Sequence, residues 1–366
     1  MDDSYRIRDV AALATPALVF YEAKIRRNIA RMGEILGGFD RLRPHIKTHK
    51  CREILDMQTA GGVTRVKCAT PKEVHFAAQA GVCDILLAYP IVGPLAYQVA
   101  AIARDYRDVR LQVLVDHADQ VAPLAAACVT VGVDVGVLVD VNPGMNRTGV
   151  AAGTEALALV ERVRDARGIR FVGLHSYGSP PAVGAPDVRA SVYRRALQTV
   201  IDTRRGLERL GISVPRVVAG NSLDFEIAAR LDGVDEVSPG TWILWDRGYE
   251  TLLPDRFVYA ALVVGRVISR PTPTLFTVDA GDKSVAADPA IPHAQVLSVP
   301  GSEVVDRWEE HLLVRLSAPS PQPAVGELVY IVPDHVCPTV NLWDEAVVVD
   351  AGGDIVGRWQ IAARGH

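Results

Sequence analysis

The hydrophobic positions of the first two thirds of the chain form short β-branched runs, each followed by a turn and an amphipathic stretch. Such an alternation is typical of parallel strands joined by crossover helices. Eight runs fit it, at residues 42–48, 64–70, 84–89, 110–116, 135–141, 170–176, 216–220 and 236–240. Helical patterns follow the first seven runs, as at 51–60, 72–80 and 93–106. The pattern predicts an α/β fold with a (β/α)8 TIM-like barrel.

The pattern changes in the last third of the chain. Strand-like runs separated by Pro, Gly and Asp turns lie at 257–269, 275–278, 294–299, 311–316, 327–332, 346–349 and 355–361, and no helical pattern is found among them. We therefore expect a barrel over 16–253 and a C-terminal β-rich domain over 254–366 that includes residues 1–15. The segment 15–21 is expected to pair with the β-rich domain.

Composition and charge narrow the class of protein. Apolar residues make up 49% and charged residues 22%, as in a globular protein with a large core. A net charge of −4 gives no basis for a nucleic-acid or membrane partner. The apolar runs fall short of the ~20 residues that span a bilayer, and the N-terminus lacks a signal-like pattern. A cytoplasmic location is expected.

Few residues can supply an amine nucleophile, because the chain has only six lysines. The first predicted strand ends in the sequence RPHIKTHK, and a barrel carries its chemistry at the carboxyl ends of the strands. In an extended segment His45, Lys47 and His49 would share one face. Burial lowers the pKa of an amine and makes it nucleophilic toward an aldehyde, so Lys47 is the candidate, with an exposed basic strand end as the alternative. Lys50 begins a helix and Lys67 lies mid-strand, so both are set aside.

Two glycine-containing turns follow the seventh and eighth predicted strands. The loops after these two strands commonly hold a phosphate in a (β/α)8 barrel, through backbone N–H groups. The candidate phosphate-binding residues are Gly220, Asn221, Ser222, Gly240 and Thr241.

Two further candidates lie elsewhere in the chain. Arg147, in a Gly-rich loop after the fifth strand, can donate to a phenolate or carboxylate, although a solvated loop arginine fits the pattern equally well. His335 and Cys337 are two residues apart, so in an extended segment they would point the same way, as two ligands of one divalent metal would. A buried His beside a buried Cys is the alternative.

Four segments together resemble the D-threonine aldolase and D-serine dehydratase family, which are fold type III pyridoxal-phosphate enzymes related to alanine racemase. They are TPALV at 15–19, RPHIKTHK at 43–50, DILLAYP at 84–90 and DHVCPTVNL at 334–342. The resemblance continues in order through nearly the whole chain, to residue 365.

The resemblance implies a role for each candidate. Lys47 matches the lysine that forms a Schiff base with pyridoxal 5′-phosphate, Arg147 the arginine beside the cofactor's phenolic oxygen, and Tyr177 a tyrosine near the pyridine ring. Gly220, Asn221, Ser222, Gly240 and Thr241 fall where the family holds the phosphate. His335 and Cys337 match the pair that binds a divalent metal such as Zn, Mn, Mg or Co. A homodimer is expected.

By resemblance the chain is a lyase acting on a small D-3-hydroxy amino acid, and two reactions are possible. The segment 338–342 and the C-terminal tail favour a D-threonine aldolase, which gives glycine and an aldehyde. Cys337 and the segment 86–90 favour a D-serine or 3-hydroxy-D-aspartate dehydratase, which releases ammonia and a 2-oxo acid. The longer match favours the aldolase, with His45 or a metal-bound water as candidate base. A non-catalytic pyridoxal-phosphate-binding protein and a cofactor-free barrel are weaker alternatives.

Overall fold

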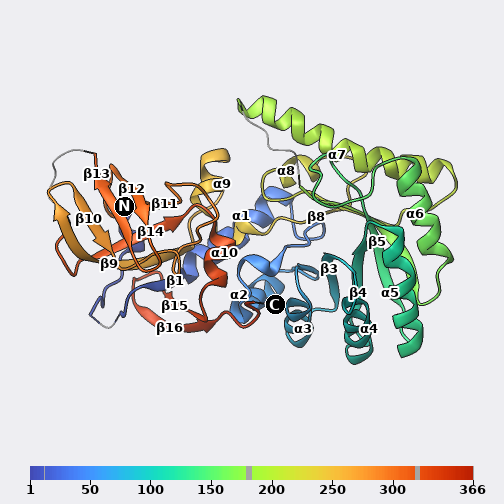
Figure 1. Cartoon of the computed structure of the whole chain (residues 1–366), viewed down its shortest axis with the longest axis horizontal. Coiled ribbons are helices and arrows are strands. Elements are labelled where there is room, and N and C mark those ends of the chain that lie inside the picture. The colour runs from blue at the N-terminus through green and yellow to red at the C-terminus, as the bar shows by residue number, and fades with distance from the viewer. Residues whose placement is uncertain (12, 179–183, 318–321, 366) are drawn as a thin grey trace. The chain divides into compact units, whose positions relative to one another are not determined.

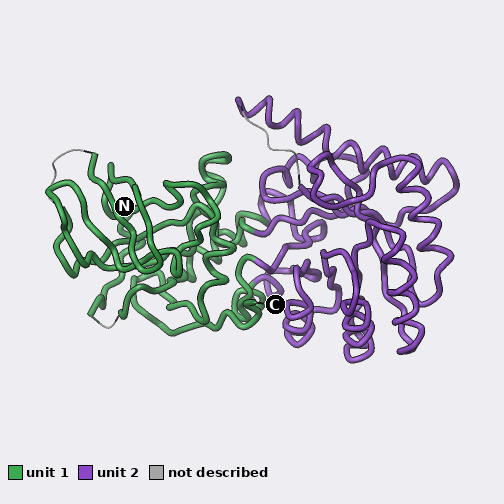
Figure 2. The backbone as a smooth tube through the Cα atoms, viewed as in Figure 1, with its two compact units in different colours: residues 1–32, 48–57, 241–365 green, residues 33–47, 58–240, 366 purple. Residues whose placement is uncertain are grey.

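A computed structural model describes residues 1–11, 13–178, 184–317 and 322–365. The chain forms two compact units (Figure 2). The first, here called the β unit, consists of Met1–Met32, Thr48–Met57 and Thr241–Gly365. The second, here called the barrel unit, consists mainly of Gly33–Lys47 and Gln58–Gly240.

The barrel unit is built on seven parallel strands that pair in sequence order (Figure 1). They are β2 (Val66–Cys68), β3 (Asp84–Pro90), β4 (Arg110–Val115), β5 (Val135–Asp140), β6 (Ile169–Ser176), β7 (Val217–Ala219) and β8 (Glu236–Val237). The segment 42–45 joins the two edges, because Leu42 bridges Val237 of β8 and His45 bridges Lys67 of β2, both in parallel. The predicted barrel is therefore confirmed, with an eighth position held by isolated bridges.

Helices follow the strands, as the hydrophobic pattern predicts. They are α3 (Pro71–Gln79), α4 (Leu95–Asp105), α5 (Ala118–Val131), α6 (Thr154–Asp165), α7 (Pro186–Arg209) and α8 (Phe225–Ala228). Their ends have local causes. Thr70 caps α3 by accepting a hydrogen bond from the Glu73 N–H, and Pro71 occupies the first turn, where it costs no backbone bond. Apolar side chains of neighbouring strands, including Leu86, Leu114 and Leu138, pack together in the barrel core.

One predicted strand is wrong in part. Residues 42–48 were expected to be extended throughout, but Ile46–Thr48 form a 3-10 helix, η2. The alternation that would place His45, Lys47 and His49 on one face of a strand therefore does not exist. Lys47 lies on a helical turn just after the segment that closes the barrel.

The β unit contains a nine-stranded mixed sheet. Its strands are β1 (Ala17–Tyr21), β9 (Ala261–Thr272), β10 (Leu275–Val278), β11 (Ala294–Val296), β12 (Ser302–Arg307), β13 (Leu312–Leu316), β14 (Leu328–Pro333), β15 (Glu345–Val349) and β16 (Ile355–Gln360). As expected, the N-terminal segment joins this sheet, because β1 pairs with β15 in parallel and with β9 in antiparallel.

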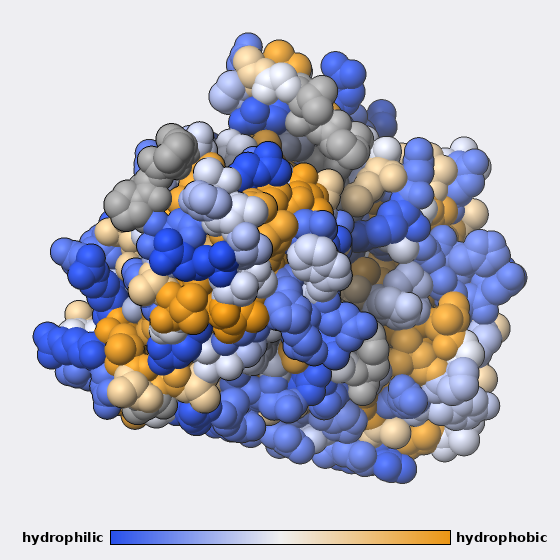
Figure 3. Space-filling view, turned by 60° about the vertical axis from the view of Figure 1, so that its left-hand side comes forward, coloured by the Kyte–Doolittle hydropathy of each residue, from blue (hydrophilic) through white to orange (hydrophobic). Residues whose placement is uncertain are grey.

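The remaining helices are α1 (Glu22–Leu36), α2 (Arg52–Ala60), α9 (Arg247–Leu252) and α10 (Val336–Asn341). Helix α10 corrects the expectation that the last third of the chain has no helix. Among the described residues, no helix has the length and hydrophobicity to cross a bilayer. On the face shown in Figure 3, hydrophobic residues are interspersed with hydrophilic ones, as on ordinary protein surfaces.

Candidate active site

A pocket of about 380 Å³ opens in the barrel unit near the carboxyl ends of its strands. It contains four residues predicted from the sequence, His45, Lys47, Arg147 and Tyr177, and so the structure brings these residues together. Its other lining residues are Lys67, Ala69, Ala88, Tyr89, Pro90, Leu114, Asp140, Thr148 and His175.

The ring of Tyr177 is the common neighbour of three basic side chains. Lys67 Nζ lies 4.5 Å, Arg147 Cζ 5.2 Å and Lys47 Nζ 5.7 Å from the ring centroid. Cations at these distances are attracted by the aromatic face. The His175 ring is stacked at an interplanar angle of 7° to Tyr177, with the centroids 6.5 Å apart. The Tyr177 ring is therefore an aromatic surface that all three basic side chains approach.

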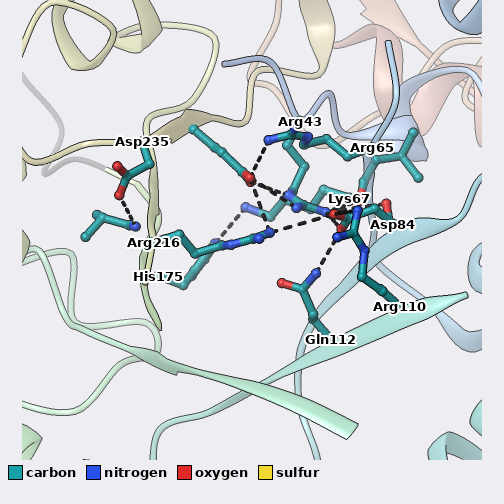
Figure 4. Close-up of polar contacts among 12 residues, drawn as sticks. Arg43, Arg65, Lys67, Asp84, Arg110, Gln112, His175, Arg216 and Asp235 are labelled. Carbon is teal, nitrogen blue, oxygen red and sulfur yellow. Dashed lines mark hydrogen bonds and ion pairs between the residues drawn. The ribbon is translucent and has the colours of Figure 1, made fainter. Parts of the chain in front are cut away.

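Lys67 is a pocket residue that the sequence reasoning set aside. Its side chain is buried and its Nζ lies 2.7 Å from His175 Nε2 (Figure 4). His175 Nδ1 lies 2.6 Å from Asp140 Oδ1, which extends the contact into a chain of three residues. Lys67 lies mid-strand, as the sequence predicts, but β2 has only three residues and ends one residue later, at Cys68. A lysine flanked by the apolar residues of a barrel strand was the signal that could have identified it.

Burial lowers the pKa values of Lys67 and His175. The pKa of Lys67 is well below its usual range because burial disfavours its charge and because Lys47 is nearby, although Asp140 opposes the shift. The pKa of His175 falls to about 4, through burial and the proximity of Lys67, again against the effect of Asp140. The imidazole is therefore neutral at neutral pH.

The loop that carries Arg147 is fixed at its base. Thr148 donates to Asp140 Oδ2 over 3.0 Å, and the Gly149 N–H donates to Asp116 Oδ2 over 2.9 Å. Gly149 has φ +102°, and a Cβ there would lie 2.5 Å from the Asn142 nitrogen, so only glycine fits. These contacts hold Arg147 at the pocket.

The loops after β7 and β8, predicted to hold a phosphate, lie side by side. Ser222 Oγ accepts a hydrogen bond from the Gly240 N–H over 3.2 Å, and the Asn221 N–H donates to Asp224. Gly220 has φ +85°, and a Cβ there would lie 3.0 Å from the Ala228 Cβ. The buried Ser238 hydroxyl finds no hydrogen-bond partner within the described chain. Thr241 begins the 3-10 helix Thr241–Ile243.

The His335 and Cys337 pair lies in the β unit. The expected extended segment is wrong, because His335 is the N-cap of α10 and Cys337 lies within that helix. The side chains are nevertheless close. Burial lowers the pKa of His335, but its contacts with Cys337 and Asp288 outweigh this effect and raise the pKa to about 9. Asp288 Oδ2 lies 2.5 Å from His335 Nδ1.

The thiol of Cys337 has hydroxyl neighbours, since its Sγ lies 3.1 Å from Thr48 Oγ1 and 3.6 Å from Thr241 Oγ1. In the part of the chain that the structure describes, no group of three or more His, Cys, Asp or Glu side chains is arranged to hold a metal ion. Any metal at this pair would therefore need ligands from outside the pair.

Comparison with known proteins gives consistent results. The alanine racemase N-terminal domain model matches residues 22–247, and the putative serine dehydratase domain model matches 260–349. A D-threonine aldolase from Arthrobacter sp. is 32% identical over 361 residues, covering 97% of this chain and 94% of that protein. A D-threo-3-hydroxyaspartate dehydratase from Delftia sp. (strain HT23) is 30% identical over 237 residues, 64% of this chain and 62% of its own. The crystal structure of D-threonine aldolase from Filomicrobium marinum aligns with a TM-score of 0.90 at 30% identity, over 97% of both chains.

Proposed function

The chain belongs to the D-threonine aldolase and D-serine dehydratase family, and on that premise we propose that it cleaves D-3-hydroxy amino acids by a retro-aldol reaction. It is a pyridoxal-phosphate-dependent lyase. The observation that supports the aldolase reaction most strongly is the similarity to D-threonine aldolase, which extends through both units. The products would be glycine and an aldehyde.

The pocket of the barrel unit fits pyridoxal 5′-phosphate. Lys47 offers an amine for the cofactor's aldehyde, Arg147 a donor for its phenolic oxygen, and Tyr177 an aromatic face. The buried hydroxyl of Ser238, at the end of β8, has no hydrogen-bond partner among the described residues. It is available to donate a hydrogen bond to an anion. When bound, the cofactor supplies an electron sink for the electron pair released at the substrate Cα.

We also propose that the residues of the β unit hold a divalent cation. His335 and Cys337 would be its ligands, and the Asp288 carboxylate on Nδ1 holds the imidazole in the tautomer that coordinates through Nε2. Imidazole with thiolate suits Zn²⁺ and other borderline cations. The cation would supply a Lewis acid that lowers the pKa of the substrate's 3-hydroxyl group.

Dehydration of D-serine or 3-hydroxy-D-aspartate is the second candidate reaction. The thiol of Cys337 favours it, because an H-x-C pair resembles the dehydratase side of the family. The match to the Delftia dehydratase supports it as well. In that reaction the chain would remove the proton on Cα, and the hydroxyl group would leave.

A product assay separates the two reactions. With D-threonine or D-allothreonine we expect glycine and acetaldehyde, identified by NMR. L-threonine should react at least about tenfold more slowly, a difference of ~1.4 kcal/mol in barrier, since its hydroxyl is misplaced when the amino acid is bound in the same pose. Ammonia and 2-oxobutanoate from the D-substrates would establish the dehydratase instead. Equal rates on L-threonine would contradict both proposals.

Metal dependence has its own test. Treatment with EDTA, or the substitution Cys337→Ala, should lower turnover about 10–100-fold, because each removes part of a small site. Cys83→Ala is a matched control at an exposed cysteine and should leave turnover unchanged. If Cys337→Ala behaves like Cys83→Ala, and EDTA has no effect, the His335 and Cys337 pair is a structural contact only.

A further inference from the structure

The pocket of the barrel unit contains two lysines, and only Lys47 has a role in the reaction so far. Lys67 lines the same pocket with 2% of its surface exposed. A buried lysine loses the hydration of its amine, and ordering its long side chain costs conformational entropy. Burying a lysine therefore lowers the stability of the fold. The pocket therefore contains a second amine whose presence requires an explanation.

The hydrogen bonds assign a direction to the chain of three residues. Asp140 Oδ1 accepts, so His175 Nδ1 carries the proton, and Nε2 then accepts from Lys67 Nζ. Asp140 Oδ2 also accepts from the Thr148 hydroxyl, which fixes the carboxylate. A neutral amine that donates to Nε2 still has its lone pair, and the lone pair can face the pocket.

The charges around Lys67 favour the neutral amine. Lys47, Arg147 and Arg43 all lower its pKa in addition to burial, and Asp140 is the one charged group among the causes that raises it. Asp140 is not the hydrogen-bond partner of the amine in this chain of three residues, since His175 lies between them. The lowered pKa and the hydrogen bond to His175 make Lys67 suited to accept a proton, in the way that buried lysines serve as bases.

The other basic groups of the pocket take part in other contacts or have other roles. Lys47 is assigned to the cofactor. His45 Nδ1 accepts the backbone N–H of Lys47 at 3.4 Å, and His175 uses both ring nitrogens. Lys67 is therefore a better candidate for a proton acceptor than either histidine.

We propose that Lys67 is the general base of the retro-aldol step, held in place by His175 and Asp140. The inference rests on the proposed aldolase function. The proton of the substrate's 3-hydroxyl group moves to the lone pair of Lys67 Nζ, and the O–H electron pair becomes the second bond of the aldehyde carbonyl. The Cα–Cβ bond breaks and its electron pair stays with Cα. Lys67 then returns the proton to Cα, which yields glycine, restores the neutral amine and uses no further reactant.

Three substitutions test this role. Lys67→Ala and Lys67→Met remove the amine, and Lys67→Arg introduces a permanent cation that cannot accept a proton at neutral pH. All three should lower kcat/KM for D-threonine about 10²–10⁴-fold. The visible absorbance of the bound cofactor should remain, because Lys47 is intact. Lys72→Met, at an exposed position on α3, is the matched control and should behave as wild type.

Two results are specific to a base. Small primary amines such as ethylamine should restore turnover of Lys67→Ala in proportion to their free-base concentration. The acidic limb of the wild-type pH–rate profile should be absent from Lys67→Met. A merely structural lysine would show neither result.

Each outcome has a distinct meaning. If the wild-type enzyme cleaves D-threonine and Lys67→Arg or Lys67→Met is equally active, Lys67 is not the base. The proposed function would then still stand. Loss of bound cofactor from all three variants would make Lys67 a structural residue and overturn its role as a base. A wild-type enzyme that holds the cofactor but releases no glycine would overturn the aldolase proposal, and the base assignment with it.

Discussion

The barrel unit contains two buried polar clusters that differ in how their charges are compensated. The first, here called the amino-end cluster, lies where the strands begin and centres on Arg43, whose side chain is fully buried. Arg43 Nε bonds Glu236 Oε2 at 2.6 Å, and Nη1 bonds Asp84 Oδ1 at 2.8 Å. Arg65, Arg110 and Arg216 also pair with these carboxylates (Figure 4). The second cluster is the chain of Lys67, His175 and Asp140.

The same burial has different results in the two clusters. Burial raises the pKa values of Asp84 and Glu236, but the Arg43 charge outweighs it and the net pKa values are lowered, so both groups stay ionised. Lys67 meets an imidazole in place of a carboxylate, and there the loss of hydration lowers its pKa. Compensated charges at the amino ends serve the fold. An amine at the carboxyl ends that has no direct counterion among the described residues is suited to chemistry.

The largest expected effect is on stability at the amino-end cluster. Arg43→Met would leave two buried carboxylates without their main partner and should lower the free energy of unfolding by about 3–5 kcal/mol. Urea denaturation measures this change. The matched control is Arg110→Met, whose side chain is 67% exposed and which should cost no more than about 1 kcal/mol. Equal effects of the two substitutions would contradict the special role of the buried arginine.

A smaller effect concerns acid. Because the folded-state pKa of Glu236 is below its ordinary value of 4.5, its contribution to stability is present above that pH and is lost as the pH falls through the folded-state pKa. Glu236→Gln should therefore be less stable than wild type at neutral pH, and the gap should narrow as the solution becomes more acidic than 4.5. Urea denaturation at a series of pH values checks this, and a gap that is constant with pH would contradict it.

Periodicity predicted most of the fold because the barrel strands are continuous apolar runs with regular helical stretches between them. It failed where short segments depart from their pattern. The segment 46–48 directly follows residues that bridge the barrel strands in parallel, and it nevertheless forms the 3-10 helix η2. Strand β12 was missed because SEVVDR has only two apolar residues, and α10 was missed because a six-residue helix is too short to show a period.

The candidate site was predictable in part, for a related reason. Lys47 and Arg147 stand in motifs that can be recognised locally, so the sequence alone pointed to them. The role of Lys67 depends on His175, which lies 108 residues away, and on Asp140 in a third strand. Such a contact exists only once the barrel has closed, and no local pattern encodes it.

The two lysines of the pocket have separate proposed roles: Lys47 holds the cofactor, and Lys67 is the general base. Chemical labelling tests this assignment most directly. The enzyme as purified with its cofactor is reduced with borohydride, which fixes the cofactor on the amine that holds it, and the labelled peptide is identified by mass spectrometry. We expect the label on Lys47, with Lys67 unmodified and Lys47→Ala unlabelled. A label on Lys67 in the wild-type protein would contradict the account, because the buried amine would then hold the cofactor and could not serve as the base.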